Sequence, residues 1–291
     1  MRRNRSVLTV LLVALLAVGV MAPSGTAAAD PPPDTTTYYL ALGDSLSQGY
    51  QEGKITDHGY VDDLYATLKI RNPGLELEKL GCPSESTTTM ISGGICPYAE
   101  GSQLAQAKEF ISDHPGQVVK ITISIGSNDV LHSSSTPSES CLTATGINAT
   151  CALAGINDVH ENLPTILNSL RDTTGFSAVG AGMTYYDPYL AAWLQGTEAG
   201  QALAKESLIY NNVLNGVLAL GYLSNDFRVA PVAFAFQTNN FTPGNFPVYG
   251  SPTNVGTICT YTWMCSAGDI HANEAGYQKI AGVFAKTFGI W

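Results

Sequence analysis

Residues at three distant places in the chain have the types that nucleophilic ester chemistry requires. Ser45 lies in the segment Gly43–Ser47, Asn128 lies mid-chain, and His271 stands near the C-terminus, two residues after Asp269. A serine hydroxyl is a weak nucleophile that needs a neighbouring base, and the transition state of acyl transfer needs hydrogen-bond donors for its oxyanion. Ser45 is therefore a candidate nucleophile, His271 a candidate base and Asn128 a candidate donor.

Each of these segments alone is also compatible with a purely structural role. Gly-Asp-Ser is a common turn, and Gly126–Asp129 could be a plain turn after a buried strand. A catalytic role is favoured because both segments directly follow apolar runs that are predicted to be strands. Open α/β sheets bind their ligands at the carboxyl ends of the strands.

Together the segments resemble the GDSL, or SGNH, hydrolase family, and the resemblance covers most of the chain from Tyr39 to the C-terminal helix. Gly43-Asp44-Ser45-Leu46-Ser47 matches the family's nucleophile block completely, and Gly126-Ser127-Asn128-Asp129 matches its Gly-x-Asn-Asp block. Asp269-Ile270-His271-Ala272, followed by Gly276-Tyr277, is similar to the block Asp-x-x-His-Pro with its following Gly-Tyr.

The resemblance implies a role for each matching residue. Ser45 would be the nucleophile and His271 its base, while the oxyanion would be held by the Asn128 side chain and the backbone N–H groups of Ser45 and Ser84. Relatives often carry a second glycine in the block Gly-Cys-Pro-Gly-Glu, where this chain has Ser84. A serine keeps the N–H, so the role survives provided that φ is not positive there.

The acid beside the histidine departs from the family pattern. Relatives place an aspartate three residues before the histidine, where this chain has Gly268, and Asp269 comes only two residues before His271. Either Asp269 reaches the ring through a different local turn, or a backbone carbonyl near Gly268 orients the ring. We favour Asp269 as the catalytic acid.

The elements that must position these residues alternate between apolar strands and amphipathic helices, which is typical of an α/β fold with a parallel sheet. With the family resemblance, this predicts a three-layer α/β/α sandwich, flavodoxin-like, with about five parallel strands. The strands are expected near residues 38–42, 75–80, 118–125, 176–183 and 227–232, and the helices near 59–70, 102–112, 155–171, 198–220 and 273–288.

Two stretches do not fit this alternation. Residues 131–154 are rich in Ser and Thr, and residues 237–268 are rich in Asn, Thr, Gly, Pro and aromatic residues. Long irregular segments in a compact domain are usually functional. We expect both to form walls of the active-site cleft.

Six cysteines fall into three local pairs along the chain. An even number in an exported protein indicates disulfides, and sequential pairing is the simplest of the 15 arrangements that six cysteines allow. A metal site is disfavoured because the chain has no Cys-x-x-Cys and no histidine at ligand spacing. The expected pairs are Cys82–Cys96, Cys141–Cys151 and Cys259–Cys265.

The N-terminus reads as a secretory signal peptide over residues 1–29, with basic residues, an apolar run and the small residues Ala27-Ala28-Ala29. A Pro- and Thr-rich leader, 30–37, precedes the hydrolase domain, 38–291. Removing the three arginines of the signal peptide changes the net charge from −10 to 11 − 24 = −13. Such an acidic protein is not expected to have nucleic acid or an anionic membrane as its main partner. No stable membrane insertion is expected either, because no segment after residue 29 is long and apolar enough to span a membrane.

These observations predict a secreted, monomeric serine esterase or lipase, a carboxylic ester hydrolase that acts on small-molecule or lipid esters without a metal or cofactor. One alternative is a carbohydrate O-deacetylase, since the family includes such enzymes. Another is a secreted binding protein that keeps the fold but has lost catalysis; the intact Ser45, Asn128 and His271 argue against it. The sequence does not select the acyl chain length.

Overall fold

Five parallel strands form the central sheet of the computed structural model, which describes residues 36–132, 140–143 and 146–290. The strand order is β4-β1-β5-β8-β9, and every neighbouring pair is parallel. The strands are β4 (Leu75–Lys79), β1 (Thr37–Gly43), β5 (Val118–Ser124), β8 (Val179–Met183) and β9 (Arg228–Ala230). The expected parallel sheet of about five strands is confirmed. The expected signal peptide, 1–29, and residues 30–35 of the leader lie outside the described residues.

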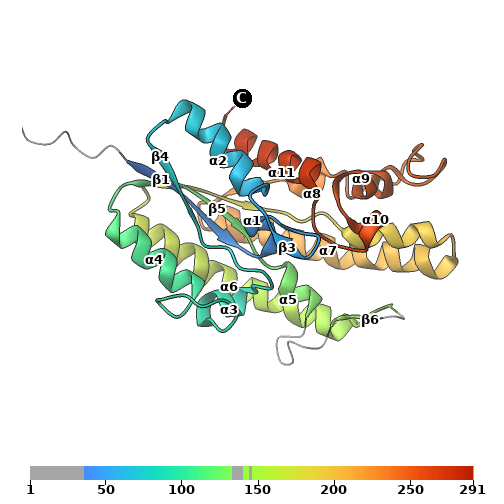
Figure 1. Ribbon diagram of the computed structural model, residues 1–291. Coiled ribbons are helices and arrows are strands. Elements are labelled where there is room, and N and C mark those ends of the chain that lie inside the picture. Colours follow the sequence, from blue (N-terminus) through green and yellow to red (C-terminus); the bar gives the residue numbers. More distant parts are fainter. Residues whose placement is uncertain (1–35, 133–139, 144–145, 291) are drawn as a thin grey trace, which may run out of the picture. The chain divides into compact units, whose positions relative to one another are not determined.

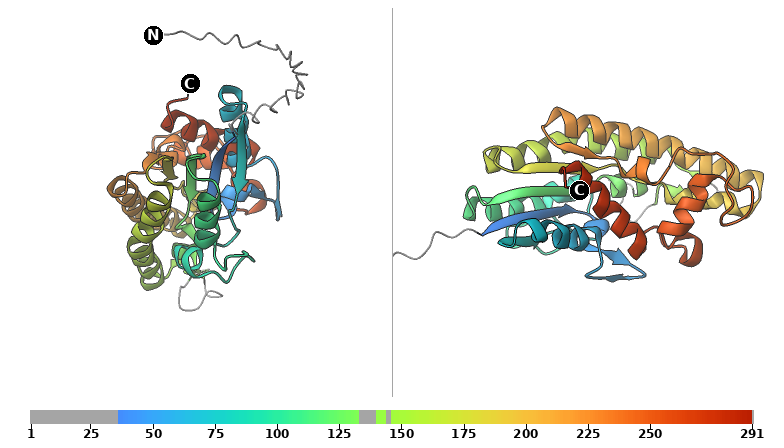
Figure 2. Two further views of the ribbon diagram at one scale, coloured as in Figure 1. Left: turned by 90° about the vertical axis from the view of Figure 1, so that its left-hand side faces the viewer. Right: turned by 90° about the horizontal axis from the view of Figure 1, so that it is seen from above.

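Helices cover both faces of this sheet (Figures 1 and 2). One face carries α2 (Tyr60–Arg71) and α11 (Glu274–Thr287), which pack against each other. The other face carries α4 (Gln103–Asp113), α6 (Ala149–Thr174) and α7 (Glu198–Ser224). The three-layer α/β/α sandwich is therefore confirmed.

The inner strands are apolar on both sides because both faces of the sheet are covered. In β1 the residues Tyr39, Leu40, Ala41 and Leu42 are all fully buried. The last strand, β9, lies at an edge and ends at Ala230, directly before Pro231. Proline has no N–H for a strand ladder, so this position agrees with the expected strand end at a sheet edge.

The segments expected to be irregular contain more structure than their composition indicated. Residues 237–268 include α9 (Thr253–Tyr261) and α10 (Met264–Ala267), and the sequence after residue 140 contains a hairpin of β6 (Leu142–Thr143) and β7 (Gly146–Ile147). Helix α6 begins six residues earlier than predicted, because Asn148 caps it by accepting the Cys151 N–H, and it continues through Pro164. The remaining short elements are α1 (Ser45–Gln48), β2 (Tyr50–Gln51), β3 (Lys54–Ile55), α3 (Thr87–Ser92), α5 (Ser127–Leu131), η1 (Pro188–Gln195) and α8 (Val232–Ala235).

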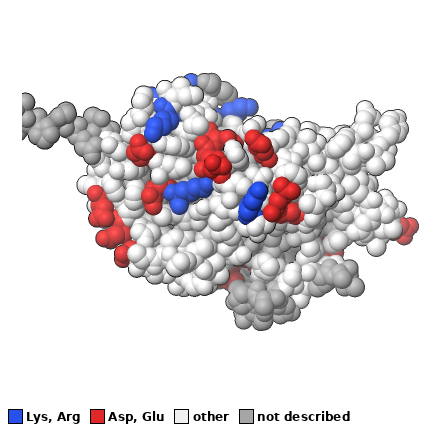
Figure 3. Space-filling model, in the orientation of Figure 1, with Lys and Arg blue, Asp and Glu red and all other residues white. Residues whose placement is uncertain are grey.

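Three disulfides join Cys82 to Cys96, Cys141 to Cys151 and Cys259 to Cys265, the pairs expected from the sequence. Among the described residues, no helix is both long and apolar enough to cross a membrane. Charged side chains of both signs mix around α2 in Figure 3, whereas the surface over α9 shows almost none. That surface belongs to residues 231–268, which contain no Lys, Arg, Asp or Glu.

The packing of α6 against α5 gives a prediction about stability. A Cβ atom on Gly155 of α6 would lie 1.7 Å from the carbonyl oxygen of Asp129 in α5, whereas one on Gly216 of α7 would meet nothing within 4 Å. We expect Gly155→Ala to lower the free energy of unfolding by about 1–3 kcal/mol through overpacking. The matched change Gly216→Ala should raise it by about 0.5–1 kcal/mol, because alanine favours the helix. Urea unfolding of both variants tests this, and equal effects would contradict the close packing of α5 on α6.

Candidate active site

The turn after β1 places Ser45 at the carboxyl edge of the sheet. Asp44 caps α1 by accepting the Leu46 N–H at 3.0 Å, and Ser45 is the first residue of that short helix. Gly43 has a φ of 131°, and a Cβ there would lie 2.1 Å from the carbonyl oxygen of Ser124. Only glycine allows this close approach of β1 to β5, so the Gly-Asp-Ser segment is a packing requirement as well as a candidate site.

A continuous chain of contacts joins Ser45, His271 and Asp269. The Ser45 Oγ lies 2.9 Å from His271 Nε2, and His271 Nδ1 lies 2.5 Å from Asp269 Oδ1. The backbone N–H of His271 also donates to Asp269 Oδ1, at 3.0 Å. An aspartate two residues before the histidine therefore reaches the ring by folding its carboxylate back over its own following backbone, as Asp side chains do in turns. The ring nitrogen contacts this carboxylate, which is the first of the two arrangements that the sequence left open.

A second oxygen contact holds Asp269 from the other side. Its Oδ2 accepts the backbone N–H of Glu52, at 2.9 Å, from the turn between β2 and β3. Burial by itself raises the pKa of Asp269. This effect is outweighed by the hydrogen bonds from His271, by the charge of His271 and by the hydrogen bond from the Glu52 N–H, so the pKa lies below its ordinary value. Asp269 is therefore a carboxylate at neutral pH. The ring of Tyr50, from β2, lies 4.8 Å from the His271 ring.

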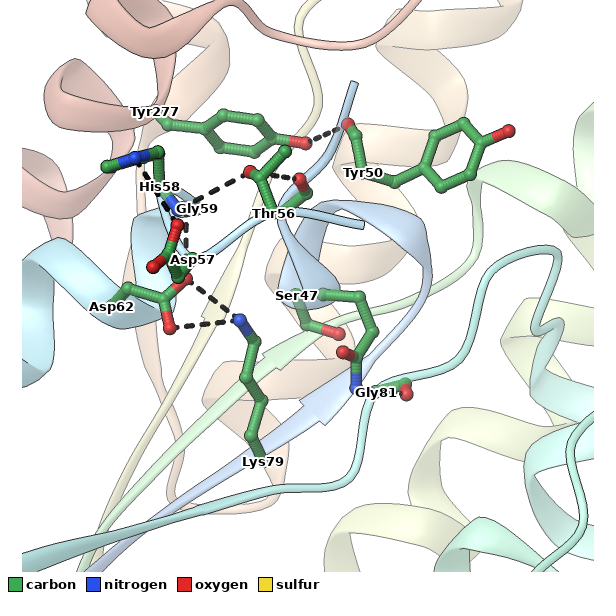
Figure 4. A network of polar contacts seen from close by, with 12 residues as sticks. Ser47, Tyr50, Thr56, Asp57, His58, Gly59, Asp62, Lys79, Gly81 and Tyr277 are labelled. Carbon is green, nitrogen blue, oxygen red and sulfur yellow. Dashed lines mark hydrogen bonds and ion pairs between the residues drawn. The ribbon is translucent and has the colours of Figure 1, made fainter. Parts of the chain in front are cut away.

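The β2–β3 hairpin that supplies Glu52 is itself held by a polar network (Figure 4). Tyr277 of α11 donates its hydroxyl to the Tyr50 carbonyl at 2.6 Å, and Thr56 donates to the carbonyl of Gly49 at 2.8 Å. Neither Glu52 nor Tyr50 was identified from the sequence. The signal that could have found the hairpin is Glu52-Gly53, a turn pair between two short extended segments.

The two loops expected to provide oxyanion donors are tied to each other. Asn128 Nδ2 donates to the carbonyl of Glu85 at 2.9 Å, so one amide N–H of Asn128 fixes the residue next to Ser84. From the sequence, φ at Ser84 is expected not to be positive if its N–H is to serve as a donor, and the structure does not meet this condition, because φ is +68°. Ser84 thus adopts the left-handed conformation that glycine adopts easily, at a cost of about 1–2 kcal/mol for a residue with a Cβ. Its N–H is retained, with the backbone geometry of a glycine.

Asp44 links several elements beneath these loops. Its fully buried carboxylate accepts the hydroxyls of Tyr185 at 2.6 Å, Ser127 at 3.0 Å and Ser124 at 3.1 Å, besides the Leu46 N–H. Burial raises the pKa of Asp44, and these four donors counteract part of that effect. Tyr185 was not identified from the sequence, although its position just after β8, at the carboxyl end of a strand, was a usable signal.

Ser45, Ser84, Asn128 and His271 all line one cavity of about 330 Å³. Of the two irregular stretches expected to form its walls, 131–154 does so through residues such as Leu142, whereas 237–268 contributes no residue to the lining. Within the described part of the chain, no three His, Cys, Asp or Glu side chains gather as a metal site would require.

Comparisons with known proteins agree with this architecture. A family model described as GDSL-like Lipase/Acylhydrolase matches residues 39–284. Among solved structures, an extracellular lipase from Streptomyces rimosus is 15% identical, with 87% of this chain and 100% of that chain covered and a TM-score of 0.51. The acetylxylan esterase Axe2 from Geobacillus stearothermophilus is 14% identical, covers 89% of this chain and 97% of its own, and gives a TM-score of 0.52. At these identities the likeness shows the fold alone. No curated protein sequence gives a significant match.

A buried carboxyl in the cavity wall gives a prediction about pH. Asp187 accepts the Tyr189 N–H at 2.9 Å and the Ser207 hydroxyl at 2.8 Å, and burial, only partly offset by these bonds, raises its pKa to about 7. In the unfolded chain the carboxyl titrates near pH 4. Between about pH 4 and 7 the unfolded chain therefore binds fewer protons than the folded protein, and stability falls as the pH rises.

Asp187→Asn should remove this dependence, since asparagine fills the same cap without titrating. We expect the stability of the natural protein relative to the variant to decline between about pH 4 and 7 and to stay level above that. Urea unfolding at a series of pH values measures the difference. A difference that is constant from pH 4 to 8 would show that the carboxyl titrates normally.

Proposed function

Because the chain belongs to the GDSL-like lipase/acylhydrolase family, we propose that it hydrolyses carboxylic esters through an acyl-enzyme formed on Ser45. The observation that carries the proposal is the contact chain Ser45–His271–Asp269, with 2.9 Å from Oγ to Nε2 and 2.5 Å from Nδ1 to the carboxylate. The same arrangement of hydroxyl, imidazole and carboxylate recurs in serine hydrolases on unrelated folds.

The reaction would take place in two acyl transfers. His271 Nε2 accepts the Ser45 proton as Oγ attacks the ester carbonyl, and returns that proton to the departing alcohol. Water then attacks the acyl-enzyme as His271 accepts its proton, and His271 returns that proton to Ser45 Oγ as the bond to the acyl group breaks and the carboxylic acid is released. Asp269 orients the ring and stabilises the imidazolium that forms in each step.

The negative charge on the tetrahedral oxygen would be stabilised by three donors, the backbone N–H groups of Ser45 and Ser84 and the side chain of Asn128. The hydrogen bond from Asn128 to the Glu85 carbonyl supports this assignment, because it fixes the amide and the Ser84 loop relative to each other before substrate binds. Donors that are already oriented need no reorganisation in the transition state.

We propose that the protein acts outside the cytoplasm as a monomer. Support for the location outside the cytoplasm comes from the signal-peptide pattern of residues 1–29, the leader 30–37 and the three disulfides, since disulfides persist in oxidising compartments. A non-catalytic binding protein is disfavoured, because binding alone would not require the contacts that join Ser45, His271 and Asp269.

The nucleophile is tested by Ser45→Ala. We expect this variant to fold normally and to lose roughly 10⁴–10⁶-fold in kcat on p-nitrophenyl acetate, and to lose labelling by a fluorophosphonate. Ser112→Ala, which changes an exposed serine of α4, is the matched control and should keep both. Labelling that persists in Ser45→Ala would assign the nucleophile elsewhere.

The acid is tested by Asp269→Asn. An asparagine keeps the shape but favours the wrong tautomer of His271, so we expect kcat to fall by up to roughly 10⁴-fold with the fold intact. Asp172→Asn, where the side chain is 66% exposed, serves as control. A kcat for Asp269→Asn within about threefold of the natural protein, which corresponds to roughly 0.7 kcal/mol, would leave Ser45 and His271 as a dyad without this acid.

A further inference from the structure

We propose that the cavity beside Ser45 holds an acyl chain of roughly eight to ten carbons, since an apolar cavity of about 150 Å³ holds the six carbons of benzene, so that the substrates are medium-chain esters. The inference rests on the proposed function, because it assumes that Ser45 is acylated. It adds the class of acyl group and the elements that select it.

The size of the cavity is the first observation. Its volume is about 330 Å³, far more than the two carbons of an acetyl group occupy. Beyond the residues of the proposed reaction, one part of the lining consists of apolar side chains from three elements: Val130 and Leu131 of α5, Leu142 and Ile147 of the β6–β7 hairpin, and Leu214 of α7. Tyrosines and a few polar side chains, among them Asp187 and Asn211, line the remainder. The apolar part of this wall offers an aliphatic chain a surface on which it can be buried.

The hairpin wall is built into the fold. Leu142 and Ile147 are cross-strand partners, so their side chains lie on the same face of the hairpin. The Cys141–Cys151 disulfide joins the hairpin to α6, and the Cys141 N–H donates to the carbonyl of Leu131 at 2.9 Å. Figure 1 shows β6 beside α5 and the beginning of α6. The Leu142–Ile147 pair is therefore anchored to both helices at its base.

The direction of the chain follows from the proposed reaction. The leaving oxygen must lie against His271 Nε2, which returns the proton, and the carbonyl oxygen must lie against Asn128. Asn128 belongs to α5, the same helix that presents Val130 and Leu131 to the cavity. The apolar wall thus begins next to the proposed oxyanion donor, so that the acyl chain, which is attached to the same carbonyl carbon, can lie against it.

The carboxyl group of Asp187 and the amide of Asn211, both in the lining, already have partners within the protein. Both carboxyl oxygens of Asp187 accept hydrogen bonds, from Tyr189 and Ser207, and the Asn211 amide donates to the Tyr186 carbonyl at 3.2 Å. Because burial also raises the pKa of Asp187 to about 7, its carboxyl carries no charge in mildly acidic solution. An apolar chain can therefore pass Asp187 and Asn211 without displacing their hydrogen-bond partners.

The first experiment compares p-nitrophenyl acetate, butyrate, octanoate, decanoate and palmitate. We expect kcat/KM to rise by roughly fourfold for each added methylene that enters the cavity, to peak at octanoate or decanoate, and to be lower for palmitate. A peak at acetate would overturn the proposal. Octyl acetate is assayed in parallel, and a preference for it over ethyl octanoate would assign the cavity to the alcohol and also overturn the proposal.

The second experiment narrows the cavity at the hairpin. Ile147→Trp should lower the ratio of kcat/KM for octanoate to that for acetate by at least tenfold, and Ile147→Ala, which adds no bulk, should lower it by about threefold through lost contact. Ile209→Trp is the matched control on α7, because Ile209 is 61% exposed and does not line the cavity. It should leave the ratio unchanged.

The two proposals fail in different ways. If the natural protein hydrolyses none of the esters and a fluorophosphonate does not label Ser45, the proposed function itself is wrong. If acetate is hydrolysed but the octanoate-to-acetate ratio is the same in the natural protein, in Ile147→Ala and in Ile147→Trp, the reaction stands and the acyl site is wrong.

Discussion

The buried carboxylate of Asp44 is the interaction on which the geometry of the site depends. A polar group without access to water must be hydrogen-bonded, and the four donors to Asp44 come from α1, the end of β5, α5 and the segment after β8. Each donor is satisfied only if its element ends at the right place. Ser45 directly follows Asp44 in the sequence, and Asn128 directly follows Ser127, which donates to Asp44. The same constraint therefore fixes the proposed nucleophile relative to the proposed oxyanion donor.

Gln103 adds a second, independent clamp from α4. Its side chain accepts the N–H of Gly43 at 2.6 Å, donates to the Gly43 carbonyl at 3.0 Å and donates to Glu85 Oε2 at 3.0 Å. The end of β1 is thereby joined to the loop that contains Ser84. The positive φ of Ser84 persists because its neighbours are fixed on both sides, by the Cys82–Cys96 disulfide before it and by Gln103 and Asn128 on Glu85 after it.

The sheet and the principal helices were predictable because their signals are local. The β-branched run of 118–125 and the helical spacing of 59–70 each reflect burial of one segment, and the parallel topology follows from their alternation. Contacts that join distant segments have no such signal: Glu52 and Asp269 are 217 residues apart, and Tyr185 and Asp44 are 141 apart. The helices in 237–268 were missed because the composition is rich in turn-forming residues while α9 is buried by tertiary packing, which overrides weak propensity.

The two-residue spacing between Asp269 and His271 explains why the β2–β3 hairpin belongs to the site. With this spacing, one carboxylate oxygen receives both the backbone N–H and the ring of His271, and the other oxygen points away from the histidine. That second oxygen would be left without a protein partner at a half-buried position, and the Glu52 N–H fills it. The hairpin is in turn anchored by Tyr277 of α11, the helix that begins three residues after His271. The orientation of the His271 ring therefore depends on segments that are far apart in the sequence. The one-residue shift of the aspartate relative to the family pattern is accommodated by the β2–β3 hairpin, which lies outside that pattern.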